Sequence, residues 1–215
     1  MEVFVEYAND GHVHHAEFIC NLIAEAAKVR GTGIARRKPA YIQQKIEQGN
    51  SVIAFSEEQV VGFCYIETWS HGMYVVHSGL IVHPDYRKTG LARKIKDKIF
   101  TLSKEKFPGS KIFGITTSLA VMKINSDLGY KPVTFSELTR DDQFWNGCKS
   151  CPNFDILTRT NKSHCLCTGM LYTPVKRPPK ENKIHRWKRF TRFMKLSKLK
   201  IGRKVGLRTT KKLKI

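Results

Sequence analysis

Three apolar stretches follow one another in the middle of the chain, and they constrain the fold more than any other feature. They cover residues 51–56, 60–69 and 73–82, and three-residue turns separate them. Short connections of this kind favour antiparallel neighbours. The middle of the chain therefore predicts a β-meander.

Helical and extended patterns surround this meander. Apolar residues at helical spacing predict helices, and alternating apolar residues predict strands. Helices are expected at 14–29, 39–48, 91–106 and 120–128, and further strands at 1–7, 111–116, 131–138 and 164–172. This order predicts an α/β fold in layers.

Positive charge is concentrated at one end of the chain. Residues 176–215 carry 17 Lys and Arg and one acidic residue, and so hold +16 of the net charge of +20. Residues 1–175 are nearly neutral, and we expect one globular domain there. No apolar run reaches the roughly 18 residues that span a bilayer, and the N-terminus has no secretory signal pattern. We expect a cytoplasmic protein that is not integral to a membrane.

The basic tail over 176–215 predicts a linker at Pro178-Pro179, followed by an amphipathic helix or a disordered segment. Apolar residues recur near helical spacing among its basic residues: Ile184, Trp187, Phe190, Met194 and Leu199. Such a segment binds a polyanion such as RNA or a membrane surface, or packs its aromatic rings on the domain. The sequence leaves both interpretations open.

The segment from Leu80 to Ala92 is the best candidate for chemistry. An apolar strand runs into a tight loop, and the loop leads into a helix. The N–H groups from Lys88 to Ala92 lack helical acceptors, and the helix dipole adds partial positive charge. Gly90 is small enough for close approach of a ligand, and Arg87 adds a full charge. The segment predicts an anion site suited to a pyrophosphate.

Two landmarks in this order resemble a known family. The pattern Arg87-x-x-Gly90-x-Ala92 after an apolar strand resembles the acyl-CoA-binding motif of the GNAT N-acyltransferases. A short helix that ends in Leu128-Gly129-Tyr130 before a Pro-containing strand is similar to the second landmark of that family. The resemblance covers about residues 1–138. It implies a GNAT fold, with a mixed, mostly antiparallel sheet whose central strands splay apart between flanking helices.

The resemblance also implies that acetyl-CoA is the co-substrate. Pantetheine would pair with the strand backbone, pyrophosphate would lie on the loop amides, and an amine would attack the acyl group directly. A backbone N–H of the strand would stabilise the oxyanion. The residues implied in cofactor binding are Leu80, Ile81, Val82, Arg87, Lys88, Thr89, Gly90, Leu91 and Ala92.

The catalytic acid and base stay open at this point. Many family members carry a Tyr acid where this chain has Asn125, which donates no proton at neutral pH. Tyr130 or Tyr86 are the alternatives, or the thiolate leaves with help from solvent. An incoming ammonium must lose a proton, and the candidate bases are Glu67 and His77. Each of these two also has a purely structural interpretation.

The loop between the first two helices is expected to form the acceptor site. Arg30, Arg36 and Arg37 lie in or next to it, and the planar guanidinium suits a carboxylate. Residues 30–33 and 145–172 resemble a GNAT subgroup of Bacteroidetes-type bacteria, whose genes lie among arginine-biosynthesis genes. We therefore expect the small-molecule acceptor to be the α-amino group of glutamate or a similar acidic amino acid. The donor is acetyl-CoA, with succinyl-CoA as an alternative.

Four cysteines cluster near an insert over about residues 139–163, which is expected to help close the acceptor site. They are Cys148, Cys151, Cys165 and Cys167. The first pair has the spacing of zinc ligands, whereas an extended Cys-x-Cys places its sulfurs too far apart. We favour no metal, with reduced thiols, while a structural zinc or a redox pair remain alternatives.

Two other functions fit the same sequence. One is a protein- or RNA-associated acetyltransferase whose basic tail delivers the substrate. The other is an acyl-CoA-binding sensor without catalysis, which the Asn at position 125 allows. A homodimer is compatible with either.

Overall fold

The computed structural model describes residues 2–31 and 36–174. The chain divides into two units, Met1–Pro174 and Val175–Ile215. The linker and helix predicted in the basic tail lie outside the described residues. In the described part of the chain, no helix is long and apolar enough to cross a membrane.

Seven strands of the described residues form one sheet. They are β1 (Val3–Tyr7), β2 (Ser51–Ser56), β3 (Gln59–Trp69), β4 (Tyr74–Val82), β5 (Lys111–Thr116), β6 (Lys131–Val133) and β7 (Thr168–Tyr172). Their spatial order is β1-β2-β3-β4-β5-β7-β6, and only the β4–β5 pair is parallel. The predicted meander is confirmed, because β2, β3 and β4 are consecutive antiparallel neighbours.

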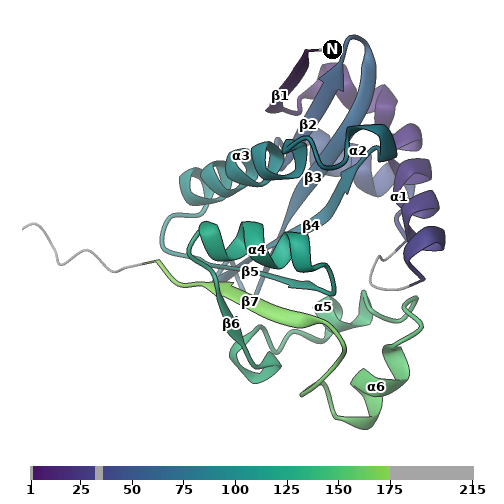
Figure 1. Cartoon of the computed structure of the whole chain (residues 1–215). Helices are drawn as coiled ribbons and strands as arrows, with labels where there is room; N and C mark the ends of the chain where they lie inside the picture. Colours follow the sequence, from purple (N-terminus) through teal and green to yellow (C-terminus); the bar gives the residue numbers. More distant parts are fainter. Residues whose placement is uncertain (1, 32–35, 175–215) are drawn as a thin grey trace, which may run out of the picture. The chain divides into compact units, whose positions relative to one another are not determined.

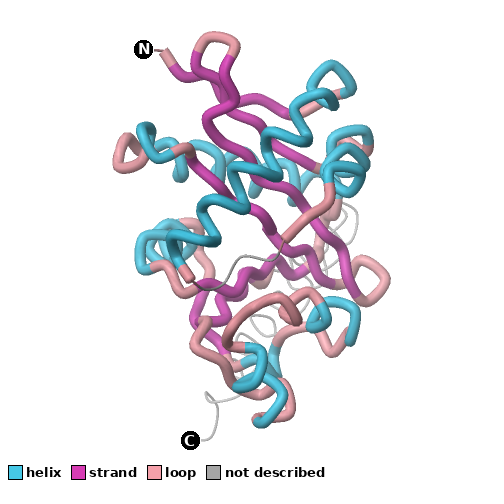
Figure 2. Tube along the Cα trace, turned by 90° about the vertical axis from the view of Figure 1, so that its right-hand side faces the viewer, coloured by secondary structure: helices cyan, strands magenta, loops and turns pink. Residues whose placement is uncertain are grey.

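Helices cover both faces of this sheet (Figures 1 and 2). They are α1 (Ala16–Arg30), α2 (Pro39–Glu47), α3 (Leu91–Lys106), α4 (Leu119–Asp127), α5 (Asp142–Asn146) and α6 (Phe154–Arg159). Successive residues of a strand point to opposite faces. Phe63 and Tyr65 of β3 therefore pack with α1 and α2, while Cys64 and Ile66 pack with α3. The predicted α/β fold with a mostly antiparallel sheet between helices is confirmed.

The central strands part where the resemblance implies a splay. β4 pairs with β5 only over Tyr74–Val76, against Lys111–Phe113. Beyond this point β4 stays paired with β3, and β5 stays paired with β7. The described residues supply no strand to the facing edges, so a gap opens between them.

A glycine shapes β4 at this gap. Gly79 has a φ of +62°, and the ring of Tyr65 lies 2.3 Å from the position that a Cβ of residue 79 would take. The β3–β4 register also shifts between Phe63 and Tyr65. Only glycine combines this backbone conformation with such a close approach of an aromatic ring.

The C-terminal part of the domain differs from the prediction in two places. β6 ends at Val133 rather than at residue 138, and a 3-10 turn follows it. β7 begins at Thr168 rather than at residue 164. Phe135 and Leu138 are nevertheless buried, in a cluster with Trp145. The apolar residues after β6 thus indicate burial, and a short apolar run does not specify a strand.

Candidate functional site

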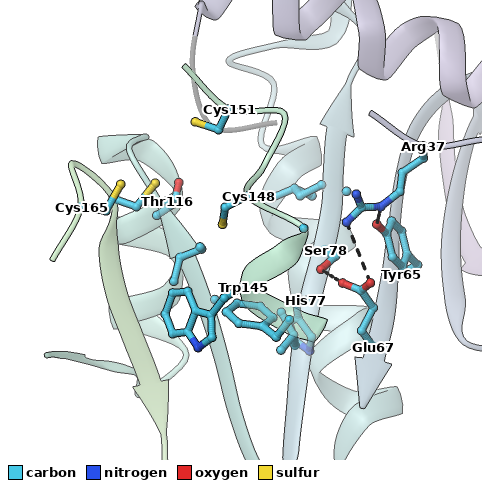
Figure 3. A pocket seen from close by; sticks show the side chains of 18 of the residues that line it. Arg37, Tyr65, Glu67, His77, Ser78, Thr116, Trp145, Cys148, Cys151 and Cys165 are labelled. Carbon is cyan, nitrogen blue, oxygen red and sulfur yellow. Dashed lines mark hydrogen bonds and ion pairs between the residues drawn. The ribbon is translucent and has the colours of Figure 1, made fainter. Parts of the chain in front are cut away.

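A cavity of about 530 Å³ lies where β4 and β5 part (Figure 3). Residues from both faces of the sheet line it, so it crosses the plane of the sheet. The lining includes Arg36, Arg37, Lys38, Tyr41, Tyr65 and Glu67, then His77, Ser78, Gly79, Leu80, Lys96, Thr116 and Asn125, and Trp145, Cys148, Cys151, Cys165 and Cys167 of the insert region. The insert therefore contributes to the wall of this cavity.

Glu67 is the carboxylate of this cavity, on the face of the sheet that α1 and α2 cover. Its side chain is buried and accepts hydrogen bonds from the hydroxyls of Tyr41 and Ser78. Burial, with the Glu67 charge second, raises the pKa of Tyr41 above its usual range, so this phenol stays a neutral donor. Two hydroxyls thus fix the carboxylate, which is buried at the cavity and does not face solvent.

Arg37 lies next to this carboxylate. Its Nη2 is 3.9 Å from Glu67 Oε1, and its Nε donates to the hydroxyl of Tyr65. Burial opposes the charge of Arg37, but Tyr65 and Glu67 outweigh burial and raise its pKa. A further donor, Nη1, reaches the backbone oxygen of Arg36 at 3.3 Å. Arg37 is therefore an integral part of the Glu67 cluster.

The other predicted cations of the acceptor loop differ in position. Arg36 is exposed and lines the cavity, and Lys38 lines it as well. Arg30 ends α1, and its side chain lies outside the described part of the structure. Arg36 and Arg37 are therefore brought to one cavity, and Arg36 is the more accessible of the two.

His77 lies on the opposite face of the sheet, toward α3. Its Nε2 is 2.8 Å from Ser103 Oγ, and that hydroxyl donates to the Ile99 backbone oxygen. Ser103 must then accept from His77, which places the proton on Nε2 and a lone pair on Nδ1. Burial and the nearby Lys96 hold the pKa of His77 well below its usual value, so the ring is neutral.

Lys96 is a site residue that the sequence analysis missed. It is 2% exposed on α3, and its Nζ is 2.9 Å from His77 Nδ1. A signal was present, since Lys96 falls on the same helical face as Ile95 and Ile99. One predicted acid, Tyr130, and the residue at the position of the family's acid, Asn125, are close by. Tyr130 Oη is 3.3 Å from the same His77 nitrogen, and Asn125 is buried on α4.

The predicted anion site lies at the start of α3. Gly90 is the residue before the helix, with a φ of +86°, and a Cβ built there meets no atom within 4 Å. Arg87, Lys88 and Thr89 are exposed around it, and Arg87 Nε donates to the Val82 oxygen at 3.3 Å. The N–H groups of the first helical turn have no acceptor within a helix. An open, positively charged surface of backbone donors is what a pyrophosphate requires.

Comparison with known proteins agrees with this geometry. Residues 16–120 match the family model described as Acetyltransferase (GNAT) family. Over these residues, which make up just under half of the chain, the sequence is similar to the GNAT family. None of the curated proteins compared matches the chain.

Solved structures show the same GNAT fold. N-acetylglutamate synthase from Neisseria gonorrhoeae, in complex with coenzyme A and N-acetyl-glutamate, is 16% identical with a TM-score of 0.57, over 80% of this chain and 35% of that one. Rv2747 from Mycobacterium tuberculosis, in complex with CoA, is 15% identical with a TM-score of 0.57, over 80% and 99%. Diaminobutyrate acetyltransferase EctA from Paenibacillus lautus is 10% identical with a TM-score of 0.55, over 82% and 98%. This chain thus spans about a third of the length of the synthase.

The four clustered thiols, those of Cys148, Cys151, Cys165 and Cys167, lie at the insert side of the cavity, and all are free (Figure 3). Cys165 and Cys167 precede β7 in a bent segment, so the expectation of an extended Cys-x-Cys is wrong. Among the described residues, no group of three or more Cys, His, Asp or Glu is arranged to hold a metal ion. Burial, with neighbouring thiols second, raises the pKa of Cys148 to about 11 and of Cys167 to about 12. Both are neutral thiols at neutral pH.

Proposed function

We propose that this GNAT domain transfers an acetyl group from acetyl-CoA to the amino group of a small acidic amino acid, with glutamate as the first candidate. The observation that carries the proposal is the cavity at the strand splay. There the carboxylate of Glu67 faces the same space as Arg36 and Lys38. An amino-acid acceptor has an ammonium and carboxylates, and this cavity offers groups of both signs.

The residues present fit acetyl-CoA. The amides at the start of α3, around Gly90, would hold the pyrophosphate, and the open space at Gly90 leaves room for it. The edge of β4 from His77 to Val82 has no strand partner toward β5 among the described residues, so its peptide groups are free to pair with pantetheine. When bound, acetyl-CoA supplies the thioester that carries the acyl group.

Glu67 is the favoured base. It lies in the cavity on the face where the acceptor loop enters, and it takes up the proton of the ammonium directly or through one water. The hydroxyls of Tyr41 and Ser78 hold its orientation. His77 is the weaker candidate, because Lys96 already lies against its one free lone pair.

Two of the similar folds support an amino acid as the acceptor, and the first of them supports an acidic one. The synthase from Neisseria gonorrhoeae was solved with N-acetyl-glutamate, and the enzyme from Paenibacillus lautus with L-2,4-diaminobutyric acid. The resemblance of residues 30–33 and 145–172 to the subgroup near arginine-biosynthesis genes points to glutamate. A succinyl donor remains the alternative to acetyl.

CoA release with a panel of acceptors tests the proposal. We expect turnover with glutamate, less with glutamine, and little with a simple alkylamine. Turnover with polypeptides alone would identify a protein-directed acetyltransferase. Tight CoA binding without turnover on any amine would identify a sensor, and absence of CoA binding would overturn the GNAT activity altogether.

Neutralising Arg36 should weaken glutamate binding selectively. If this exposed guanidinium binds a carboxylate of the acceptor, Arg36→Gln removes a charge-assisted hydrogen bond of roughly 1.5–3 kcal/mol. The loss raises the KM for glutamate about 10- to 150-fold.

Arg37→Gln should instead lower kcat, because Arg37 is part of the Glu67 cluster. Steady-state kinetics with glutamate, glutamine and an alkylamine separate these effects. The exposed Arg140, outside the cavity lining, is the control as Arg140→Gln. Equal KM values for Arg36→Gln and the control would contradict the proposal.

The second candidate function rests on the charge of the basic tail. Deleting residues 176–215 removes +16 of the net charge of +20. If the tail only binds a polyanion, the truncated enzyme keeps its turnover of small amines but elutes from heparin at much lower salt. Salt-gradient elution and kinetics on the same two proteins measure both. Loss of small-amine turnover in a folded truncation would show that the tail belongs to the active site.

A further inference from the structure

Lys96 is a buried cation without an anion. Within the described residues it forms no ion pair, and it is 2% exposed. Its Nζ contacts His77 Nδ1 at 2.9 Å and lies 5.3 Å from the centre of the Tyr130 ring. A buried ammonium without an anion destabilises a fold, so a functional role would explain why a lysine is buried at this position.

The direction of the hydrogen bonds around His77 shows which way Lys96 points its protons. Ser103 donates to the Ile99 oxygen, so His77 Nε2 donates to Ser103. His77 Nδ1 then offers a single lone pair, and Lys96, at 2.9 Å, is the nearer of two donors to it, ahead of the Tyr130 hydroxyl at 3.3 Å. An ammonium has three N–H groups. Only one of the three is used by His77.

The remaining N–H groups of Lys96 have no hydrogen-bond acceptor among the described residues, so they are available to a ligand in the cavity. Lys96 from α3, His77 from β4 and Asn125 from α4 line it together, on the face opposite Glu67. Asn125 Oδ1 is buried there without a hydrogen-bond partner in the described part of the chain. This end of the cavity therefore presents unsatisfied polar groups beside the strand edge that is free to pair with pantetheine.

We propose that Lys96 Nζ donates the proton that the CoA sulfur takes up as the thioester C–S bond breaks, an inference that rests on the proposed acetyl transfer. The acceptor ammonium first loses one proton to solvent by way of Glu67, and the resulting amine nitrogen then forms its bond to the acyl carbon and gives up a second proton to Glu67. The electron pair of the C–S bond goes to sulfur, and Lys96 passes one proton to that sulfur. Lys96 becomes a neutral amine and regains a proton from solvent through the open cavity.

The surroundings of Lys96 suit this role. The titratable groups that face it are His77 on β4, Cys64 on β3 and Tyr130 after α4. Burial lowers the pKa of Lys96 to about 8, near the roughly 8.5 of a free thiol, so the proton transfer is nearly balanced. Burial raises the pKa of Tyr130 well above its usual value, which makes this phenol the poorer acid. Asn125 cannot donate a proton at all.

A binding measurement tests the inference without turnover. The ultraviolet absorbance of the thiolate, followed against pH, gives the thiol pKa of CoA in its complex with the enzyme. With the wild type we expect this pKa to lie about one unit or more below that of free CoA, because a nearby cation favours the thiolate. Lys96→Met should remove the shift, and Lys104→Met, an exposed lysine on the same helix, should keep it. A shift that survives Lys96→Met would overturn the role of Lys96. Absence of CoA binding by the wild type would instead overturn the proposed function.

Kinetics separate proton donation from a purely electrostatic role. Lys96→Arg keeps the charge, but a guanidinium does not give up its proton in proteins. We expect Lys96→Arg to keep much of the thiol shift and yet to be as slow as Lys96→Met, with kcat about 10²- to 10⁴-fold below the wild type. The KM for acetyl-CoA should change only a few-fold. Full kcat in Lys96→Arg would rule out proton donation.

Stability provides an independent measurement. The folded-state pKa of Lys96 is lowered, so the unfolded chain binds more protons between about pH 8 and 10.5, and stability rises with pH over this window. Lys96→Met should lack this rise and should melt no lower than the wild type at pH 7, since it removes a buried charge. A lower melting temperature for Lys96→Met at pH 7 would show that Lys96 is structural.

Discussion

We expect Gly90→Glu to abolish CoA binding while the domain stays folded. A Cβ at residue 90 meets no atom within 4 Å, so a side chain can begin there without a clash. A glutamate side chain would place a carboxylate over the amides at the start of α3, where the pyrophosphate is expected. Calorimetric titration with CoA measures the loss, and circular dichroism checks the fold.

Gly90→Ala separates the charge from backbone strain. Residue 90 has a φ of +86°, so any L-residue there carries strain of about 1–2 kcal/mol. Alanine has this strain without the anion, and we expect it to bind CoA measurably. Unchanged CoA affinity in a folded Gly90→Glu variant would refute the assignment of this loop and, with it, the CoA-dependent activity.

The second large effect is expected for Glu67→Gln. An amide cannot accept the proton of the attacking amine, so kcat should fall about 10²- to 10⁴-fold, while CoA affinity stays close to that of the parent. Glu58→Gln, on the exposed turn between β2 and β3, is the matched control.

The kinetics of Glu67→Gln have three possible outcomes, and each indicates a different role for Glu67. A loss confined to kcat supports the base. A rise confined to the KM of the amine means that Glu67 binds the ammonium and leaves proton removal to solvent. If both constants match those of Glu58→Gln, this carboxylate has no part in the reaction.

The sequence predicted the framework of this domain closely, because the framework depends on regular patterns. The bounds of β2, β5 and α3 follow directly from apolar runs and from a 3.6-residue stripe. The anion site was predicted from a local motif, because a local motif can be recognised in a sequence without knowledge of the tertiary contacts. The resemblance of this motif to the GNAT family is what supplied the splay between β4 and β5.

The sequence alone could not predict where the site side chains lie relative to one another in the folded domain. Glu67 and His77 are both strand residues with polar side chains, but the β3–β4 register pairs His77 with Ile66 and sends the two to opposite faces. Lys96 falls on an apolar helical stripe, and a lysine in such a position usually extends its amine to water. Only the contacts with His77 and Tyr130 show that it does not. The bend at Cys165 and Cys167 likewise depends on the insert, which has no periodic pattern.

The close fit of Gly79 beneath the ring of Tyr65 has a consequence for how this enzyme can evolve. Any larger residue at position 79 would displace Tyr65, and Tyr65 holds Arg37 beside Glu67. The absence of a side chain at residue 79 therefore couples the conformation of β4 at the gap to the positions of Arg37 and Glu67. Variation in β4 at this point disturbs both at once. New acceptor preferences should accordingly arise at other residues that line the cavity, such as Arg36 and those of the insert, while β4 stays fixed across descendants.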